Sequence, residues 1–136
     1  MDRLSIAALI GGVLLNIVGH RTFWYRRAKE LADRRPNISQ DEFVSSLAPD
    51  VDANTARWFW GVLRPYYPKA FSPHPDDCPL GQLDIDAFEP DDWTEDFCLA
   101  NGLARDAIAS VDTVSPASLR NMLKHLVSER ARILAR

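Results

Sequence analysis

The longest hydrophobic segment of the chain lies at its amino end. Residues 4–18 read LSIAALIGGVLLNIV, and only Ser5 and Asn16 interrupt the apolar side chains. A helix that is apolar on every side is buried in protein or in lipid. The fifteen residues rise about 22 Å as a helix, less than the roughly 30 Å hydrocarbon core of a bilayer. The helix can continue beyond this segment as far as Pro36, where proline stops it.

The residues that follow the hydrophobic segment favour a membrane anchor. Three consecutive aromatic residues at 23–25 resemble an interfacial aromatic belt, and Arg21 can extend its charge to the headgroups. A basic flank at 26–29 follows. The apolar segment and its flanks predict that residues 4–25 hold the protein in the membrane. The positive-inside rule then predicts that the remainder lies on the cytoplasmic side. A short buried core helix and a cleaved signal peptide are the alternatives, although no A-x-A-like cleavage site follows.

Capping residues and prolines mark helix boundaries in the next part of the chain. Ser39 and Glu42 form a capping-box pattern in front of a helix that Pro49 ends. Asp52 is a suitable N-cap for the following helix, which Pro65 closes. These boundaries predict two short consecutive helices.

The second half of the chain carries similar boundary signals. Pro90 stands in the first turn of a predicted helix that ends at Asn101-Gly102. The pattern at 104–111 allows a short helix. A long final helix is predicted to begin with Ser115 as its cap and Pro116 in its first turn.

The connection between the two groups of helices is unusually long. Residues 65–88 contain five prolines and no sustained hydrophobic period, which predicts a wrapped or functional loop. No strand pattern is present. We therefore expect an all-α fold, a small helical bundle with a long N-terminal helix and one long Pro-rich loop. The predicted division is an anchor helix with a basic extension at 1–36 and a single helical domain at 37–136.

The net charge of −3 conceals three segments of different sign. Residues 1–36 carry +4, residues 37–104 carry −10 and residues 105–136 carry +3. Because binding to phosphates requires a basic surface, the acidic middle argues against a nucleic-acid partner. Either the basic ends fold back on the acidic middle, or the acidic middle serves a basic partner.

Catalytic and metal-binding signatures are weak. Cys78 and Cys98 fit neither a zinc ribbon nor a dense disulfide framework, and His74 could share a metal with Cys78 only if a fourth ligand existed. No nucleophile elbow, phosphate loop or zinc-protease motif is present. The sequence therefore predicts no cofactor and favours a non-enzymatic protein.

Nine acidic side chains and no Lys or Arg lie between residues 74 and 97. An EF-hand loop beginning at Asp84 would place Asp86, Asp92 and Glu95 at ligand positions. Glu89, however, occupies the position where that loop needs glycine for its sharp turn. Calcium binding is therefore disfavoured, and a docking role for the acids is preferred.

One part of the chain resembles a known family. The stretch LGQLDIDAFEPDDWTEDFCLANGL has a leucine-bearing loop followed by an acidic helix of the form D-D-x-x-x-x-F, from Asp91 to Phe97. Over residues 38–104 this resembles small bacterial domains of unknown function related to acyl carrier proteins. A carrier has a serine after an aspartate at the head of this helix, whereas Ile85 and Ala87 follow the aspartates here. The resemblance therefore implies an acidic recognition surface for basic partners, without a phosphopantetheine arm.

Together these patterns predict a membrane-anchored interaction or accessory protein that docks a basic protein surface through an acidic helix. The predicted partner-binding residues are Asp84, Asp86, Asp91, Asp92, Glu95 and Asp96. The alternative is a small metal-dependent regulator or enzyme built around the same cluster. A convex acidic helix favours the docking protein, whereas a lone carboxylate in a deep pocket favours the enzyme.

Overall fold

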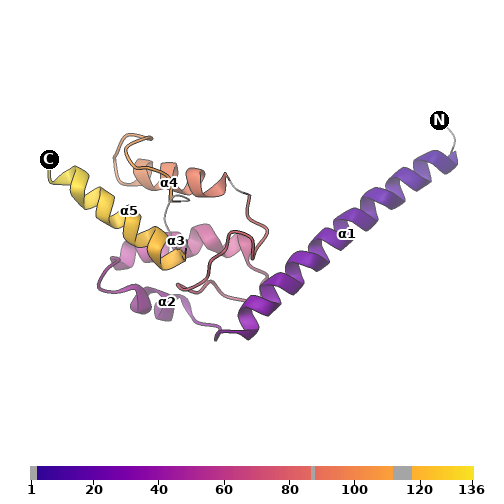
Figure 1. Cartoon of the computed structure of the whole chain (residues 1–136), viewed down its shortest axis with the longest axis horizontal. Coiled ribbons are helices and arrows are strands. Elements are labelled where there is room, and N and C mark those ends of the chain that lie inside the picture. The colour runs from indigo at the N-terminus through magenta and orange to yellow at the C-terminus, as the bar shows by residue number, and fades with distance from the viewer. Residues whose placement is uncertain (1–2, 87, 112–117) are drawn as a thin grey trace.

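A long helix, α1 (Arg3–Asp33), projects from a small bundle of shorter helices (Figure 1). The computed structural model describes residues 3–86, 88–111 and 118–136, with side chains from Ala8 onward. Within these residues the other elements are α2 (Gln40–Leu47), α3 (Ala53–Leu63), the 3-10 turn η1 (Arg64–Tyr66), α4 (Glu89–Ala100) and α5 (Leu119–Leu134). No strand occurs among them, so the all-α prediction is confirmed.

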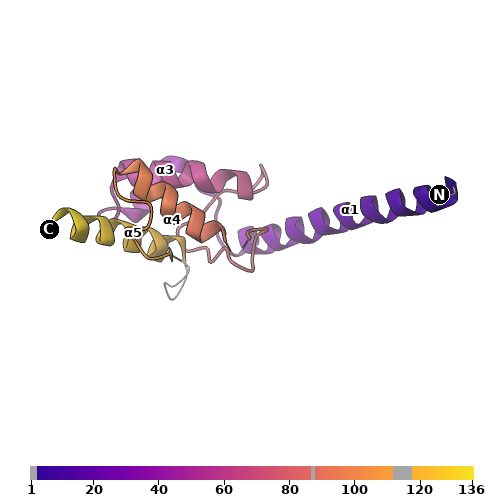
Figure 2. The ribbon, with the colours of Figure 1, turned by 90° about the horizontal axis from the view of Figure 1, so that it is seen from above.

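Only the carboxyl-terminal half of α1, from His20 onward, contacts the rest of the domain. Ala28 is buried in the core, Leu31 packs beside it, and the Tyr25 ring lies 5.6 Å from the Phe71 ring. The 31 residues of α1 span about 46 Å, so its amino-terminal half extends well beyond the other helices. The view in Figure 2 shows the same projection from above.

The local capping predictions for α2 and α3 are confirmed. The Ser39 hydroxyl accepts a hydrogen bond from the Glu42 amide, and the Glu42 carboxylate accepts one from the Ser39 amide. The Asp52 carboxylate accepts a hydrogen bond from the Thr55 amide at 3.0 Å. The helix before Pro65 ends at Leu63, and the chain continues through Pro65 as the 3-10 turn η1.

The core of the bundle joins all four shorter helices. Phe59 of α3 meets Trp93 of α4 edge to face, with ring centroids 5.6 Å apart. Side chains at helical spacing on each helix contribute the rest, and the fully buried ones include Phe43, Leu47, Leu63, Phe97, Met122, Leu123 and Leu126. These residues are the apolar stripes of the sequence, which fixes the faces that α2 to α5 turn inward.

The long proline-rich segment is a wrapped loop held by polar contacts. The Arg64 guanidinium donates to the backbone carbonyls of Lys69 and Phe71, at 3.0 and 3.1 Å. Such contacts satisfy backbone carbonyls that no helix or sheet pairs. Residues 67–71 therefore fold back onto the end of η1.

The same loop carries the most buried charged group described. The Asp77 side chain is 2% exposed and accepts two hydrogen bonds from the Arg35 guanidinium, both at 2.9 Å. The Tyr67 hydroxyl donates to the same carboxylate at 2.6 Å, and the Asp77 backbone carbonyl accepts from the Leu119 amide at 2.9 Å. Burial, together with the Asp77 charge, raises the pKa of Tyr67 above its ordinary value. Asp77 thus joins the chain after α1, the loop and the start of α5.

The described residues between α4 and α5 contain no α-helix. The prediction of a short helix at 104–111 is wrong, because residues 105–108 form a turn and a bend and residues 104, 109 and 110 have no regular secondary structure. An isolated segment this short nucleates a helix poorly. The predicted cap of the final helix, Ser115, and Pro116 lie outside the described residues. In the described part, α5 has Ser118 as its N-cap, and the Ser118 hydroxyl accepts a hydrogen bond from the Asn121 amide.

Candidate interaction surfaces

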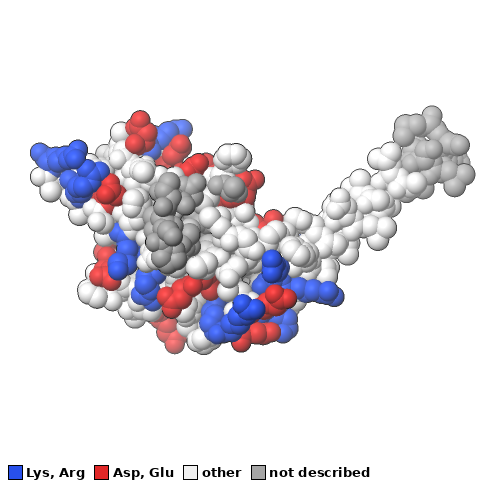
Figure 3. Space-filling model, viewed as in Figure 1, with Lys and Arg blue, Asp and Glu red and all other residues white. Residues whose placement is uncertain are grey.

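The amino-terminal half of α1 presents an exposed apolar surface, which we call the apolar rod and define as residues 8–18. Its large side chains are between 50% and 75% exposed: Leu9, Ile10, Val13, Leu14, Leu15, Ile17 and Val18. No Asp, Glu, Lys or Arg occurs between residues 4 and 20. Figure 3 shows the described part of the rod as an uncharged surface, with Lys and Arg gathered at its base. Continuous apolar surface of this kind marks an interaction site in a monomer.

The apolar side chains of the rod do not gather on one side. Leu14 and Leu15 are successive positions, so they point about 100° apart, and both are more than half exposed. A helix that lies flat in a membrane interface needs an apolar face opposed to a polar one. The apolar rod has no such division, so whatever covers it must surround it.

In the part of the chain that the structure describes, no helix is both long enough and apolar enough to cross a membrane. The predicted transmembrane helix is therefore not supported.

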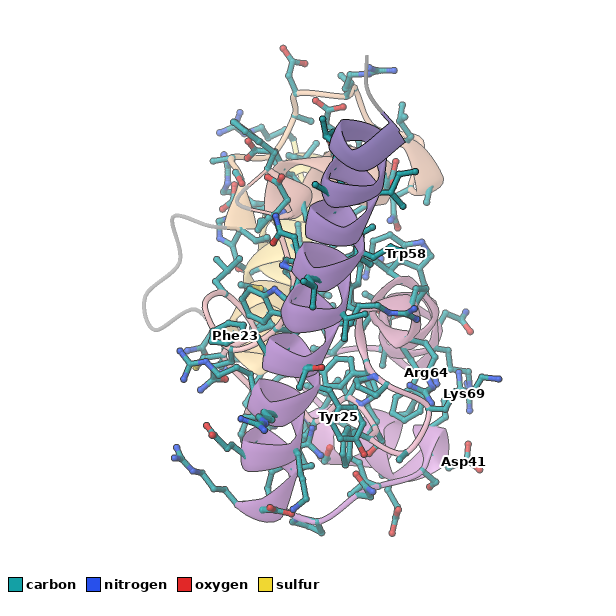
Figure 4. The ribbon with its side chains drawn as sticks, turned by 90° about the vertical axis from the view of Figure 1, so that its right-hand side faces the viewer. Phe23, Tyr25, Asp41, Trp58, Arg64 and Lys69 are labelled. Carbon is teal, nitrogen blue, oxygen red and sulfur yellow. The ribbon has the colours of Figure 1, made fainter. Side chains whose placement is uncertain are left out.

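The aromatic residues of the predicted belt have different contacts, although Phe23 and Tyr25 are both about half exposed. Phe23 is 51% exposed, and the Arg27 guanidinium lies 5.5 Å from its ring centroid. Tyr25 instead packs against Phe71 of the loop. Figure 4 shows Phe23 and Tyr25 on different sides of α1. Tyr25 thus helps attach α1 to the bundle, while Phe23 remains available at the rod's base.

The six predicted partner-binding acids do not form one surface. Asp84 lies beside α1, where its carboxylate is 2.9 Å from Nε2 of His20. Asp86 accepts a hydrogen bond from the Phe88 amide at 2.9 Å, which stabilises the turn before α4. The other four acids are on α4.

On α4 the acids have two different environments. Glu95 lies 3.6 Å from Arg105, whereas Asp91, Asp92 and Asp96 form no ion pair with a Lys or Arg of the described residues. Asp91 and Asp92 stand in the first turn, where the helix dipole favours negative charge. Asp96 has neither form of stabilisation and is exposed.

Part of the negative charge of the acidic middle is neutralised within the fold. This agrees with the alternative in which the basic ends of the chain fold back on the middle. Arg35 pairs with Asp77, and Arg120 of α5 pairs with Asp76 at 3.1 Å. Lys124 lies 3.6 Å from Asp50. Among the described residues, neither Arg120 nor Lys124 of α5 pairs with an acid of α4. The acids of α4 therefore remain the least neutralised group.

A groove of about 230 Å³ lies between α4 and the turns that follow it. Asp91, Glu95 and Asp106 bring three carboxylates to its lining, and Arg105 brings one guanidinium. Sequence reasoning missed Asp106, because it lies beyond the acidic stretch and in a segment expected to be helical. The excess of carboxylates gives the groove a negative potential that suits a cationic side chain.

A second groove, of about 300 Å³, lies between α3, the end of α4 and α5. Arg130 crosses it, donating to Asp52 and to Asn101 at 2.8 Å, with its guanidinium 5.5 Å from the Phe97 ring. Partial burial opposes ionisation of Asp52, but hydrogen bonds from Arg130 and Thr55 prevail and lower its pKa. These polar groups satisfy one another's hydrogen bonds. The residues of this groove therefore serve to connect the start of α3 with α5.

Neither groove carries a cluster of side chains suited to a metal ion among the described residues. The described residues contain no group of three or more His, Cys, Asp or Glu side chains placed to hold a metal ion. Cys78 and Cys98 are free thiols; Cys98 is buried, and this burial raises its pKa. No protein-family model, curated protein or solved structure matches the chain.

Proposed function

We propose that the protein is a membrane-associated accessory protein that inserts the apolar rod into lipid and holds its helical bundle at the membrane surface. The observation that carries this proposal is the exposure of seven large apolar side chains around the whole circumference of α1. Lipid hydrocarbon can surround a helix on every side, which a groove in a partner cannot do as completely.

Insertion of the apolar rod into lipid provides a substantial hydrophobic free energy. Full burial of a Val, Leu or Ile side chain contributes about 1.5–3 kcal/mol. The side chains of the rod are half or more exposed, so each can still contribute about 1 kcal/mol, and the set about 7 kcal/mol. A helix whose axis enters the bilayer gains this energy without having to cross it.

The charges after the rod suit a position at the headgroups. Arg21, Arg26, Arg27 and Lys29 follow it, and no carboxylate occurs from residue 4 to residue 29. Each basic side chain near an anionic membrane surface contributes about 1 kcal/mol. In this proposal the same basic residues keep the bundle on the cytoplasmic side.

Vesicle flotation tests the proposal directly. The full chain is expected to float with phosphatidylcholine vesicles in a sucrose gradient, and a variant lacking residues 1–18 is expected to remain at the bottom. The helical domain should keep its thermal unfolding midpoint in the shorter variant, because no described side chain before Ala28 belongs to the buried core. A full chain that forms stable oligomers in buffer and ignores vesicles would contradict the proposal and indicate that copies of α1 cover one another.

The second half of the proposal is that the acids of α4 dock a basic protein surface at the membrane. Asp92, Asp96 and Leu99 lie at successive helical turns on one exposed stripe, and Leu99 is 52% exposed. An apolar side chain one turn beyond two exposed carboxylates suits a partner that combines an apolar contact with Lys or Arg. The arrangement is convex, which favours docking over catalysis.

Charge reversal at Asp96 tests this docking. A photo-crosslinking residue at Leu99 should capture a basic protein in membranes, and Asp96→Lys should lower the yield severalfold at low salt and less at high salt. Asp41→Lys is the matched control, since Asp41 is exposed but lies on α2. Equal yields from the two variants, or a captured protein whose contact surface is not basic, would reject the docking face.

A further inference from the structure

A shallow hollow of about 340 Å³ runs along one face of α1, at the point where the apolar rod meets the charged part of the helix. Val13, Asn16, Ile17, His20 and Arg21 line it. These residues are three or four positions apart, so they share one face of the helix. The hollow therefore continues from apolar to cationic surface along a single line.

The two ends of the hollow differ in chemistry over a short distance. Val13 and Ile17 supply the apolar end, and His20 and Arg21 supply the polar end. Val13 and Arg21 are eight positions apart, which corresponds to about 12 Å along the helix axis. This order matches a phospholipid, whose acyl chains lie deeper in the membrane than its phosphate.

The charge at the polar end is available. Arg21 has no ion pair among the residues that the structure describes. Asp84 is the acidic residue that contacts the lining of the hollow, because its carboxylate lies 2.9 Å from Nε2 of His20. The edge of the His20 ring also meets Trp24, with ring centroids 6.1 Å apart. These contacts hold the imidazole in place and leave the Arg21 guanidinium without an ionic partner among the described residues.

We propose that this hollow binds one anionic phospholipid, with the phosphate at Arg21 and an acyl chain over Val13 and Ile17. The inference rests on the proposed membrane association and adds a lipid class and a position to it. The site also sets the depth of insertion, because the phosphate must lie level with Arg21. The apolar rod then lies below the headgroups and the bundle lies outside them.

The test compares two arginines that carry the same charge on the same helix. The full chain is floated with vesicles of phosphatidylcholine alone and with vesicles that also contain phosphatidylglycerol. Wild type is expected to bind both and to prefer the anionic ones. Arg21→Gln should reduce that preference about tenfold, as expected for loss of a hydrogen bond to a charged group. Arg26→Gln, which lies outside the hollow, should reduce it no more than about fivefold through the diffuse surface potential.

Native mass spectrometry of the detergent-released chain gives a second readout. One phosphatidylglycerol should remain on wild type and on the Arg26 variant, and none on the Arg21 variant. If the chain binds both kinds of vesicle equally, or if the two variants lose the same preference, membrane association stands and the lipid site is overturned. If the chain binds neither kind of vesicle, the proposed function and the lipid site both fail.

Discussion

Replacing Ile10 and Leu14 with aspartate is expected to release the protein from vesicles while leaving its helical domain folded. The two side chains are 55% and 56% exposed, so the bundle loses no packing when they change. In a membrane each replacement exchanges a favourable residue for one that costs about 3 kcal/mol at the centre of a helix. Together they weaken partition by about 6 kcal/mol, or roughly four powers of ten.

The control for this experiment is a pair of equally exposed leucines elsewhere. Leu99 on α4 and Leu134 on α5 are 52% and 68% exposed. Aspartate at both positions should leave flotation unchanged, because these side chains are outside the proposed membrane contact. Flotation separates the two double variants, and circular dichroism melting confirms that both are folded. Release of both variants to the same extent would show that vesicle binding depends on general surface hydrophobicity rather than on α1.

The elements of this fold that could be predicted are those whose signals are local. The capping box of Ser39 and Glu42, the cap at Asp52 and the proline in the first turn of α4 depend on residues within one helical turn. The distinction between apolar and polar faces is also local, because it follows from helical spacing. The all-α class and most boundaries follow from these signals.

The roles of the acidic residues could not be predicted in the same way. Asp76 and Asp77 are adjacent in the sequence, yet the Asp76 side chain is 65% exposed and the Asp77 side chain 2%. Asp84 belongs to the acidic stretch, but its contact is 64 residues away on α1. Such pairings depend on how the loop wraps, and the loop has no periodic pattern to indicate this. The sequence therefore located the acidic region but not the subset that remains unpaired on α4.

The same uncertainty applied to the apolar segment. Its composition allowed lipid, a protein core or a cleaved signal as its destination. The fold excludes burial in the core of this chain, since the apolar rod projects away from the bundle (Figure 1). Nothing local in the sequence indicates this, because the contacts of α1 with the rest of the domain begin only at His20, beyond the apolar rod.

Asparagine in place of Asp77 is expected to destabilise the helical domain by about 3–5 kcal/mol, the usual cost of breaking a buried ion pair from one side. Arg35 would keep its charge in a site where its side chain is only 10% exposed. The amide could accept one of the two guanidinium hydrogen bonds, but its NH₂ group would face the other donors. The Tyr67 hydroxyl, which donates to Asp77 at 2.6 Å, would also lose a charged acceptor.

Asp76→Asn is the control, because it makes the same chemical change one residue away. The Asp76 side chain is exposed and pairs with a partly exposed Arg120, so its loss should cost no more than about 1 kcal/mol. Urea unfolding of the full chain at neutral pH measures both losses, and the midpoints are compared at equal slope. Equal losses for the two variants would mean that Asp77 does not hold the fold together.

The Asp77 variant also bears on how α1 is held. Arg35 lies two residues beyond the end of α1, and its Nη2 also donates to the Ser72 carbonyl at 2.6 Å. Losing the carboxylate should therefore loosen the base of α1 at urea concentrations where the rest of the bundle is still folded. Amide hydrogen exchange is expected to show faster exchange at residues 28–38 than in α3, whereas Asp76→Asn should leave both regions unchanged. Uniform acceleration across the bundle would instead assign the contact to global stability alone, with no separate part in fixing where the rod leaves the domain.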